Sequence, residues 1–209
     1  MSIDVLLEII RNRRSVRDFS GEEVTAAEVR ALVEAAGQAP SNSNRQAWRF
    51  LAVKSKDVRA RLRQAVVARM GELERSLTSP EERAGLEAYG RYLTFFADAP
   101  VLIVVLCKRS PAFLESLLRR AGVPAAEGSL PAEGFSAAMA VQNLLLAAHA
   151  MGLGACCVTG PLIAAGEFRE ILRVPSAYLF AALVPVGRPA GPTLAPPRKP
   201  VDEILEVIP

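Results

Sequence analysis

The segment Val101-Leu-Ile-Val-Val-Leu-Cys107, which Pro100 precedes, is a continuous apolar run rich in β-branched residues. Such a run is typical of a strand that is buried on both of its faces. Further strands are expected at Trp48–Val53, at Gly154–Thr159 and at Leu179–Val186, where apolar residues lie between turn-forming ones. The chain therefore combines several strands with the helical segments that separate them.

Apolar residues at helical spacing mark these segments. Ile3–Arg11 is expected to be a helix, and Thr25-Ala-Ala-Glu28 matches a capping box at the start of the next one. Lys54–Ala97 is helical and rich in charges, with a break at Thr78–Pro80 that would place the proline in a first helical turn. Ser136–Met151 is apolar almost all round, which predicts a central helix buried almost all round, at a subunit interface.

Three segments complete the chain. Pro111–Pro131 mixes a short helix with glycine and proline residues and is expected to lie over a site. Ile163–Leu172 is predicted to be a helix. Residues 191–209 carry five prolines, which suits an extended arm lying across another surface rather than a folded unit. Residues 1–209 are therefore interpreted as a single domain ending in an arm at about 191–209.

Composition limits the kinds of function. The 209 residues are 51% hydrophobic and only 22% charged, which favours burial of apolar surface against a partner subunit. The net charge is +3, the arginines are scattered and no nucleic-acid-binding module is present, so we expect no nucleic-acid partner. Polar and glycine residues interrupt the most apolar segment, Phe135–Val158, so we expect no membrane span. Asp4 and Glu8 argue against a signal peptide, and we expect a cytoplasmic protein.

Few residues suit metal binding or hydrolysis. Cys107, Cys156 and Cys157 lie in apolar contexts and are expected to be buried small side chains. His149 is the only histidine, so neither a histidine-rich metal site nor a serine hydrolase triad is expected. We expect no metal. No Gly-x-Gly-x-x-Gly motif follows a strand, and no phosphate-binding Gly-x-x-x-x-Gly-Lys motif is present.

The segment Arg13-Arg-Ser-Val-Arg17 places three guanidiniums and a hydroxyl where the first helix is expected to end. A guanidinium matches the oxygens of a phosphate well, which points to an anion-binding site. The alternative is a solvated basic helix end, because cations also complement the dipole at the C-terminus of a helix.

Other polar residues stand out in apolar surroundings: the loop Ser41–Gln46, Gln142-Asn143, Thr159-Gly160 and Arg198-Lys199. Amide side chains both donate and accept hydrogen bonds, as a bound heterocycle would require, so this set fits a cofactor. Hydrogen bonds between helices explain Gln142-Asn143 equally well, and turn formation explains the Ser41–Gln46 loop.

Together these residues resemble the nitroreductase family of FMN-dependent NAD(P)H oxidoreductases, and the resemblance spans nearly the whole chain. Its motifs occur in the family's order. They are Arg13-Arg-Ser-Val-Arg17 with Phe19, Ala39-Pro-Ser-Asn-Ser-Asn-Arg-Gln-Ala-Trp48, Ala99-Pro-Val101, Gln142-Asn-Leu-Leu-Leu-Ala-Ala148 with Met151-Gly-Leu-Gly154, Val184-Pro-Val-Gly187 and Arg198-Lys-Pro200.

The resemblance implies an α+β fold, an α/β sandwich whose antiparallel-dominated central sheet is flanked by helices. It further implies an entwined homodimer with a C-terminal arm and FMN bound at the dimer interface. Arg13 and Ser15 would then hold the FMN phosphate, with Arg14 beside them and Arg198 added from the arm. Arg17 would lie near N1 and O2 of the flavin ring.

The remaining implied contacts come from two other segments. One is a loop that would meet the flavin from the other subunit, and the second is backbone near flavin N5. The residues are Pro40, Ser41, Asn42 and Asn44 in the loop, and Thr159 and Gly160 near N5.

The implied activity is hydride transfer from NADH or NADPH, through FMN, to a small electron-poor acceptor such as a nitroaromatic, quinone or enone, in a ping-pong cycle. No catalytic side chain is expected. The alternatives are a non-catalytic flavin-binding or storage protein, and a specialised member that dehalogenates, oxidises azolines or fragments flavin. An apolar dimeric interaction domain whose arginines merely bind anions is a further alternative.

Overall fold

The computed structural model describes residues 3–108, 113–124 and 132–208, and strand β2 (Val101–Lys108) lies at the centre of its sheet. The strand order is β1-β2-β4-β3, with β1 at Trp48–Val53, β4 at Tyr178–Gly187 and β3 at Gly154–Ala155. All three pairings are antiparallel. The expected antiparallel sheet is therefore present.

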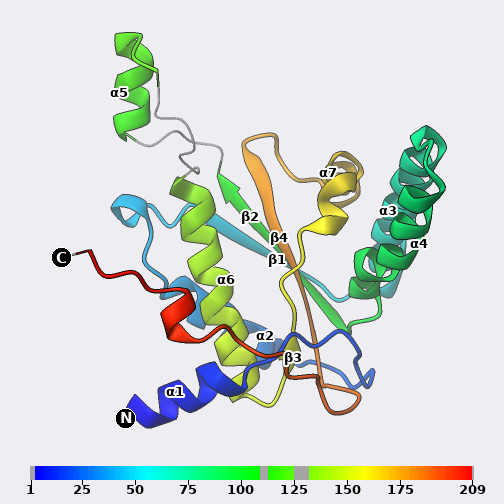
Figure 1. Ribbon diagram of the computed structural model, residues 1–209, viewed down its shortest axis with the longest axis horizontal. Helices are drawn as coiled ribbons and strands as arrows, with labels where there is room; N and C mark the ends of the chain where they lie inside the picture. Colours follow the sequence, from blue (N-terminus) through cyan, green and yellow to red (C-terminus); the bar gives the residue numbers. More distant parts are fainter. Residues whose placement is uncertain (1–2, 109–112, 125–131, 209) are drawn as a thin grey trace.

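Alternate side chains of β2 enter two different cores, since successive residues of a strand face opposite ways. One core contains Val101, Ile103 and Val105 with residues of α2 (Ala26–Gly37) and α6 (Ala132–Ala150). The other contains Leu102, Val104 and Leu106 with residues of α3, α4 and α7. Figure 1 shows these two helical layers on either side of the strands. The fold is thus a helix–sheet–helix sandwich, as the resemblance implied.

The helices begin where the sequence predicts. Hydroxyl side chains of Ser55 and Ser79 accept hydrogen bonds from the first turns of α3 (Lys56–Ser76) and α4 (Pro80–Thr94), and Thr25 and Glu28 form the expected capping box on α2. The other helices are α1, α5 and α7, at Ile3–Asn12, Phe113–Ala121 and Ala165–Leu172. Four short 3-10 helices lie at Asn42–Asn44, Phe95–Ala97, Gly160–Ala164 and Val201–Glu203. Residues 111–112 and 125–131 of the segment expected over a site lie outside the described residues.

The strand expected at Gly154–Thr159 is wrong beyond its first two residues. Only Gly154 and Ala155 pair regularly with β4, while Val158 makes an isolated bridge to Leu183. The residue opposite Cys156 is Pro185, whose carbonyl accepts from the Cys156 amide at 3.4 Å but which has no N–H to return a bond. The ladder therefore breaks there, and residues 157–160 leave the sheet.

Three further expectations are corrected. The helix expected at Ile163–Leu172 starts with the 3-10 turn Gly160–Ala164 before α7. Cys157 is exposed, unlike Cys107 and Cys156, because it lies where the chain leaves the sheet. Helix α6 begins at Ala132 and is buried on one side only. Within one chain its exposed residues are Phe135, Ala138, Met139, Gln142 and Ala150.

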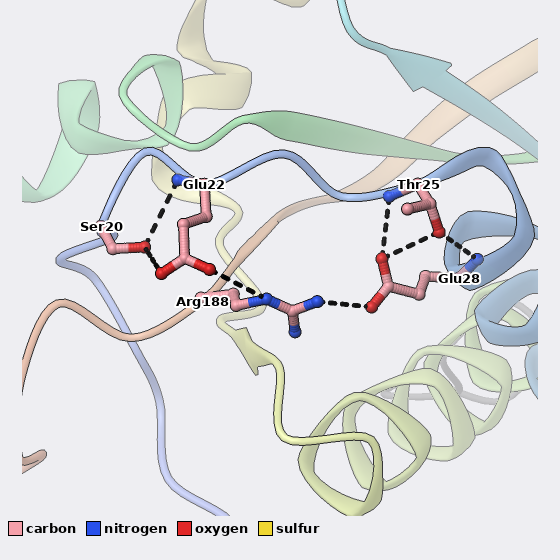
Figure 2. A network of polar contacts seen from close by, with 5 residues as sticks. All are labelled: Ser20, Glu22, Thr25, Glu28 and Arg188. Atoms are coloured by element: carbon pink, nitrogen blue, oxygen red, sulfur yellow. Dashed lines mark hydrogen bonds and ion pairs between the residues drawn. The ribbon is translucent and has the colours of Figure 1, made fainter.

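An ionic network joins the end of β4 to the start of α2 (Figure 2). The guanidinium of Arg188 lies 2.8 Å from Glu28 Oε1 and 3.5 Å from Glu22 Oε2. Glu28 Oε2 also accepts from the backbone N–H of Thr25 at 2.8 Å. The backbone N–H of Thr25, then Arg188 and the Thr25 hydroxyl, lower the pKa of the Glu28 carboxyl below its ordinary value.

We expect the stabilisation from Glu28 to be pH-dependent. Its folded pKa lies below the unfolded value of about 4.3, so the contribution is present above that pH and disappears as the pH falls through the folded pKa. Urea unfolding should show Glu28→Gln less stable than wild type near neutral pH, with the difference shrinking in acid. Glu34→Gln, on the same helix, is the control for loss of charge. A difference that stays constant into acid would contradict this assignment.

Candidate functional site

The arginine cluster follows α1 directly and is fixed beside β3. Ser15 makes a parallel bridge with Ala155, and the amide of Val16 donates to the Ala155 carbonyl at 3.1 Å. Val16 is buried, and its side chain lies where any Cβ on Gly154 would be only 2.6 Å away. Since side chains alternate along extended backbone, the neighbours of Val16 point outward. Ser15 and Arg17 are exposed accordingly.

Arg14 partly closes the end of α1. Its Nη1 donates to the carbonyls of Arg11 at 2.6 Å and Arg13 at 2.9 Å. These are the carbonyls that a helix end leaves without partners, so the helix-end interpretation holds for this residue. A guanidinium has five N–H donors, and donors on Nε and Nη2 are left for another anion.

The arginine cluster and the C-terminal segment line one groove of about 970 Å³. Arg14, Ser15 and Arg17 form one wall, and residues 190–196 with Arg198 form the other. Asp18 is the acidic residue in that lining, so three guanidiniums face a single carboxylate. The fold thus brings Arg198 to the cluster, as expected, although the sequence separates them widely.

Arg13 does not line this groove but lies near Cys156, beneath the cluster. Burial raises the pKa of the Cys156 thiol, while Arg17, a hydrogen bond with Ser15, and Arg13 act in the opposite direction. The predicted anion-binding residues therefore surround a small buried thiol, and Arg14 rather than Arg13 faces the groove.

A second pocket of about 350 Å³ adjoins the first through Arg17, which lines both. Thr159 and Gly160 form its floor together with Cys157 and Val158. A Cβ on Gly160 would lie 2.5 Å from Cδ2 of Leu93, so only glycine lets this backbone approach α4 so closely. The predicted residues Arg17, Thr159 and Gly160 therefore meet in one pocket.

The opposite wall of this pocket was missed by sequence reasoning. It is formed by Tyr89, Tyr92 and Phe95, which belong to the charged helical segment whose role the sequence left unassigned. Their spacing of three residues places them on one face of α4 and its extension, and this spacing is the signal that could have found them.

The loop Pro40–Asn44 lies elsewhere, at the start of α6. The amide of Asn42 donates to Ser136 Oγ at 3.2 Å, and Ser41 Oγ accepts from the Gln46 amide at 3.0 Å. Ser43 and Asn44 both have φ of 51°, in the left-handed region. Side-chain hydrogen bonds thus hold this loop in a tight, specific conformation that keeps the predicted residues together.

An ion pair holds the end of the loop against α6. Arg45 Nη1 lies 3.0 Å from Oε1 of Glu133, without the alignment of a hydrogen bond. The Glu133 side chain is only 8% exposed and lies in the first turn of α6, where the helix dipole favours a negative charge. The loop is therefore anchored on a buried carboxylate.

The two halves of the predicted site lie at opposite ends of α6. The loop contacts Ser136, whereas Arg14 lines a small pocket with His149 and Gly152. Thirteen residues separate Ser136 from His149, which corresponds to about 20 Å of helix. Figure 1 shows the loop near one end of α6 and the arginine-bearing segment after α1 at the other. One chain does not bring Pro40–Asn44 to Arg17.

The amide pair on α6 divides between two environments. Asn143 Nδ2 donates to the Ala35 carbonyl of α2 at 3.2 Å, which is the interhelical bond of the alternative interpretation. Gln142 is exposed in the single chain. Over residues 3–108, 113–124 and 132–208, no helix could cross a membrane, and no three or more His, Cys, Asp or Glu residues form a potential metal site.

Residues 10–188 match the profile of the nitroreductase family. The chain belongs to the nitroreductase family. Its likeness extends to the iodotyrosine deiodinase of Haliscomenobacter hydrossis, which is 30% identical over 192 residues, or 90% of this chain and 81% of that protein.

Solved structures agree with this assignment. A BluB-like flavoprotein from Clostridium difficile superposes with a TM-score of 0.89 and 26% identity, covering 97% of this chain and 98% of that one. A nitroreductase with bound FMN from Desulfitobacterium hafniense gives a TM-score of 0.71 at 26% identity, covering 97% of each chain. Family relatives of this fold therefore include flavoproteins, one of them with its FMN in place.

Proposed function

We propose that this protein is an FMN-dependent oxidoreductase. It would take hydride from NADH or NADPH and reduce a small electron-poor acceptor such as a nitroaromatic, a quinone or an enone, in a ping-pong cycle. The observation that carries the proposal is the pair of adjoining hollows, one cationic and one aromatic, that share Arg17. Family membership and the FMN-bound relative support it.

The residues present fit FMN. A groove of about 970 Å³ is at the upper end of the range for small-molecule sites, roughly 300–1,000 Å³. Arg14 and Arg198 can bind the phosphate as forked donors, with the Ser15 hydroxyl between them, and Arg13 adds positive charge nearby. The excess of guanidinium over carboxylate in this groove is what a dianionic phosphate requires.

When bound, FMN supplies two-electron hydride chemistry at its N5 atom. The chain's own task is to orient the reactants and stabilise charge. Arg17, at the junction of the two hollows, is the fixed cation that would balance negative charge on the N1–O2 side of the ring. The backbone of Thr159 and Gly160 would lie beside N5, since it forms the floor of the aromatic pocket.

We further propose that the active form is a homodimer. The loop Pro40–Asn44 reaches the arginine cluster only from a second copy, because about 20 Å of α6 separates them within one chain. Helix α1 buries none of its residues although it is strongly amphipathic. Large apolar side chains are also exposed on α6 and the C-terminal segment, namely Phe135, Met139, Leu194, Val201, Ile204, Leu205, Val207 and Ile208.

Light scattering on the eluted protein should give twice the mass of the 22.4 kDa chain. Replacing Ile204 and Leu205 with Asp should shift the mass toward that of one chain, because charges would then enter apolar contacts between copies. Asp202→Asn, in the same segment, is the control. A monomer that binds FMN in full would contradict the role of a second copy.

Arg198→Ala should weaken FMN binding by about 1.5–3 kcal/mol, the value of a charge-assisted hydrogen bond. Ser15→Ala should cost about 0.5–1.5 kcal/mol, as for a neutral bond. Lys199→Ala removes the same charge from the neighbouring position and should leave the affinity nearly unchanged. Fluorescence titration of the apoprotein with FMN measures all three, and wild-type affinity in Arg198→Ala would place the phosphate elsewhere.

Anaerobic mixing with NADH and then NADPH tests the activity. We expect the flavin absorbance to bleach with at least one of them and to return on addition of a quinone or nitroaromatic. Bleaching with neither would favour the flavin-storage alternative, and a protein that takes up no FMN would exclude the proposed function.

Reductive dehalogenation is the second candidate, favoured by the identity to iodotyrosine deiodinases across most of the chain. Iodide release from 3-iodotyrosine, measured with the reduced protein, distinguishes it from nitro or quinone reduction. The aromatic wall of the pocket is compatible with either kind of substrate.

A further inference from the structure

The pocket beside Thr159 and Gly160 has an aromatic wall that is open to solvent. Tyr89 is 56% exposed and Tyr92 is 38% exposed. Their ring centroids lie 5.8 Å apart with the planes tilted by 40°. The Tyr89 hydroxyl lies 3.9 Å from the place of a Cβ on Gly160, so this ring leans over the pocket floor. Two large rings held in this way present π-faces to whatever enters.

Two guanidiniums flank the same wall. Cζ of Arg91 lies 4.9 Å from the centroid of the Tyr92 ring, and its Nη2 donates to the Tyr92 hydroxyl at 3.1 Å. Cζ of Arg17 lies 5.8 Å from the same centroid. Arg17 lines the pocket, whereas Arg91 reaches it through Tyr92. The wall is therefore both aromatic and cationic.

No negative charge offsets these cations where the structure is described. The pocket lining contains no Asp or Glu. Among the ion pairs of the described residues, neither Arg17 nor Arg91 has a carboxylate partner. A compound with a negative substituent would meet two available guanidiniums and no opposing carboxylate.

The pocket is also small. Its volume of about 350 Å³ is near the lower end of the range for small-molecule sites, roughly 300–1,000 Å³. A compound of one or two rings fits this space, and a planar ring is the shape that the exposed tyrosine faces can stack against.

We propose that this pocket selects planar aromatic acceptors that carry an anionic substituent such as a carboxylate. Tyr89 and Tyr92 stack the ring, and Arg17 attracts the negative group. Arg91 is a positioning residue that holds Tyr92 and adds charge at the rim. The inference rests on the proposed function and deepens it by naming the substrate class.

The test compares 4-nitrobenzoate with 4-nitrobenzamide, which have the same shape and the same reducible group but differ in charge. Reduction of each nitro group to nitroso takes one hydride from the nicotinamide and one proton from water, and it releases hydroxide. Wild-type kcat/KM should favour the anion by roughly tenfold, the effect of one charge-assisted hydrogen bond. Arg91→Gln and Tyr92→Leu should each reduce this preference to about threefold or less.

Arg61→Gln is the matched control, since it removes the same charge from an exposed position on α3 outside the pocket. Its preference for the anion should equal that of wild type. Tyr92→Phe keeps the ring but loses the bond from Arg91, so its preference should fall between wild type and Tyr92→Leu. An anion preference that Arg91→Gln and Tyr92→Leu leave unchanged would overturn the proposal, as would equal wild-type rates for the two compounds.

Equilibrium binding supplies a second readout that needs no turnover. Calorimetric titration of the oxidised, FMN-containing protein should show benzoate binding more tightly than benzamide, with the difference reduced in Arg91→Gln and retained in Arg61→Gln. Equal binding of the two would contradict the anionic subsite even if both nitro compounds are reduced. Failure to take up FMN, or to be reduced by either nicotinamide, contradicts the proposed function instead, and titration of that protein still decides the subsite.

Discussion

Burial of strand β2 on both faces is the constraint on which the rest of the structure depends. Because Val101 to Leu106 send alternate side chains into two separate cores, each face of the sheet must be covered by helices. Each fully buried Val or Leu side chain contributes about 1.5–3 kcal/mol, so exposing either face would remove much of the stability of the fold. α2 and α6 cover one side, and α3, α4 and α7 cover the other. The loops and chain ends that bear functional residues are fixed by this sandwich.

The candidate site forms where that regular packing stops. Pro185, within β4, cannot complete the ladder with the chain opposite, so residues 157–160 leave the sheet and turn under α4. On the near side of the break, Ser15 and Val16 pair beside Ala155 and direct Arg17 outward. Arg17 consequently stands between a cationic groove and an aromatic pocket. One missing backbone donor thus accounts for both the exposure of Thr159 and its nearness to Arg17.

Local signals predicted most of the fold. The capping box at Thr25, the proline start of α4 and the apolar run of β2 each depend on neighbours in sequence, so they were correct. Errors arose where distant partners decide the outcome: the extent of β3 depends on Pro185, and the exposure of α6 depends on what covers its second face. For the site, motifs grouped Arg14, Ser15, Arg17, Thr159, Gly160 and Arg198 as the structure places them. The tyrosines of α4 were missed because an aromatic at helical spacing usually indicates core packing.

The length of α6 has a genetic consequence. In the proposed homodimer each site draws its loop from one chain and its arginine cluster from the other. A chain altered only in the Pro40–Asn44 loop and a chain altered only at Arg198 would therefore complement each other. Their mixed dimer would contain one site with both defects and one with none, whereas each pure dimer would carry a defect in both sites. Two inactive alleles could in this way restore half of the sites in a mixed dimer.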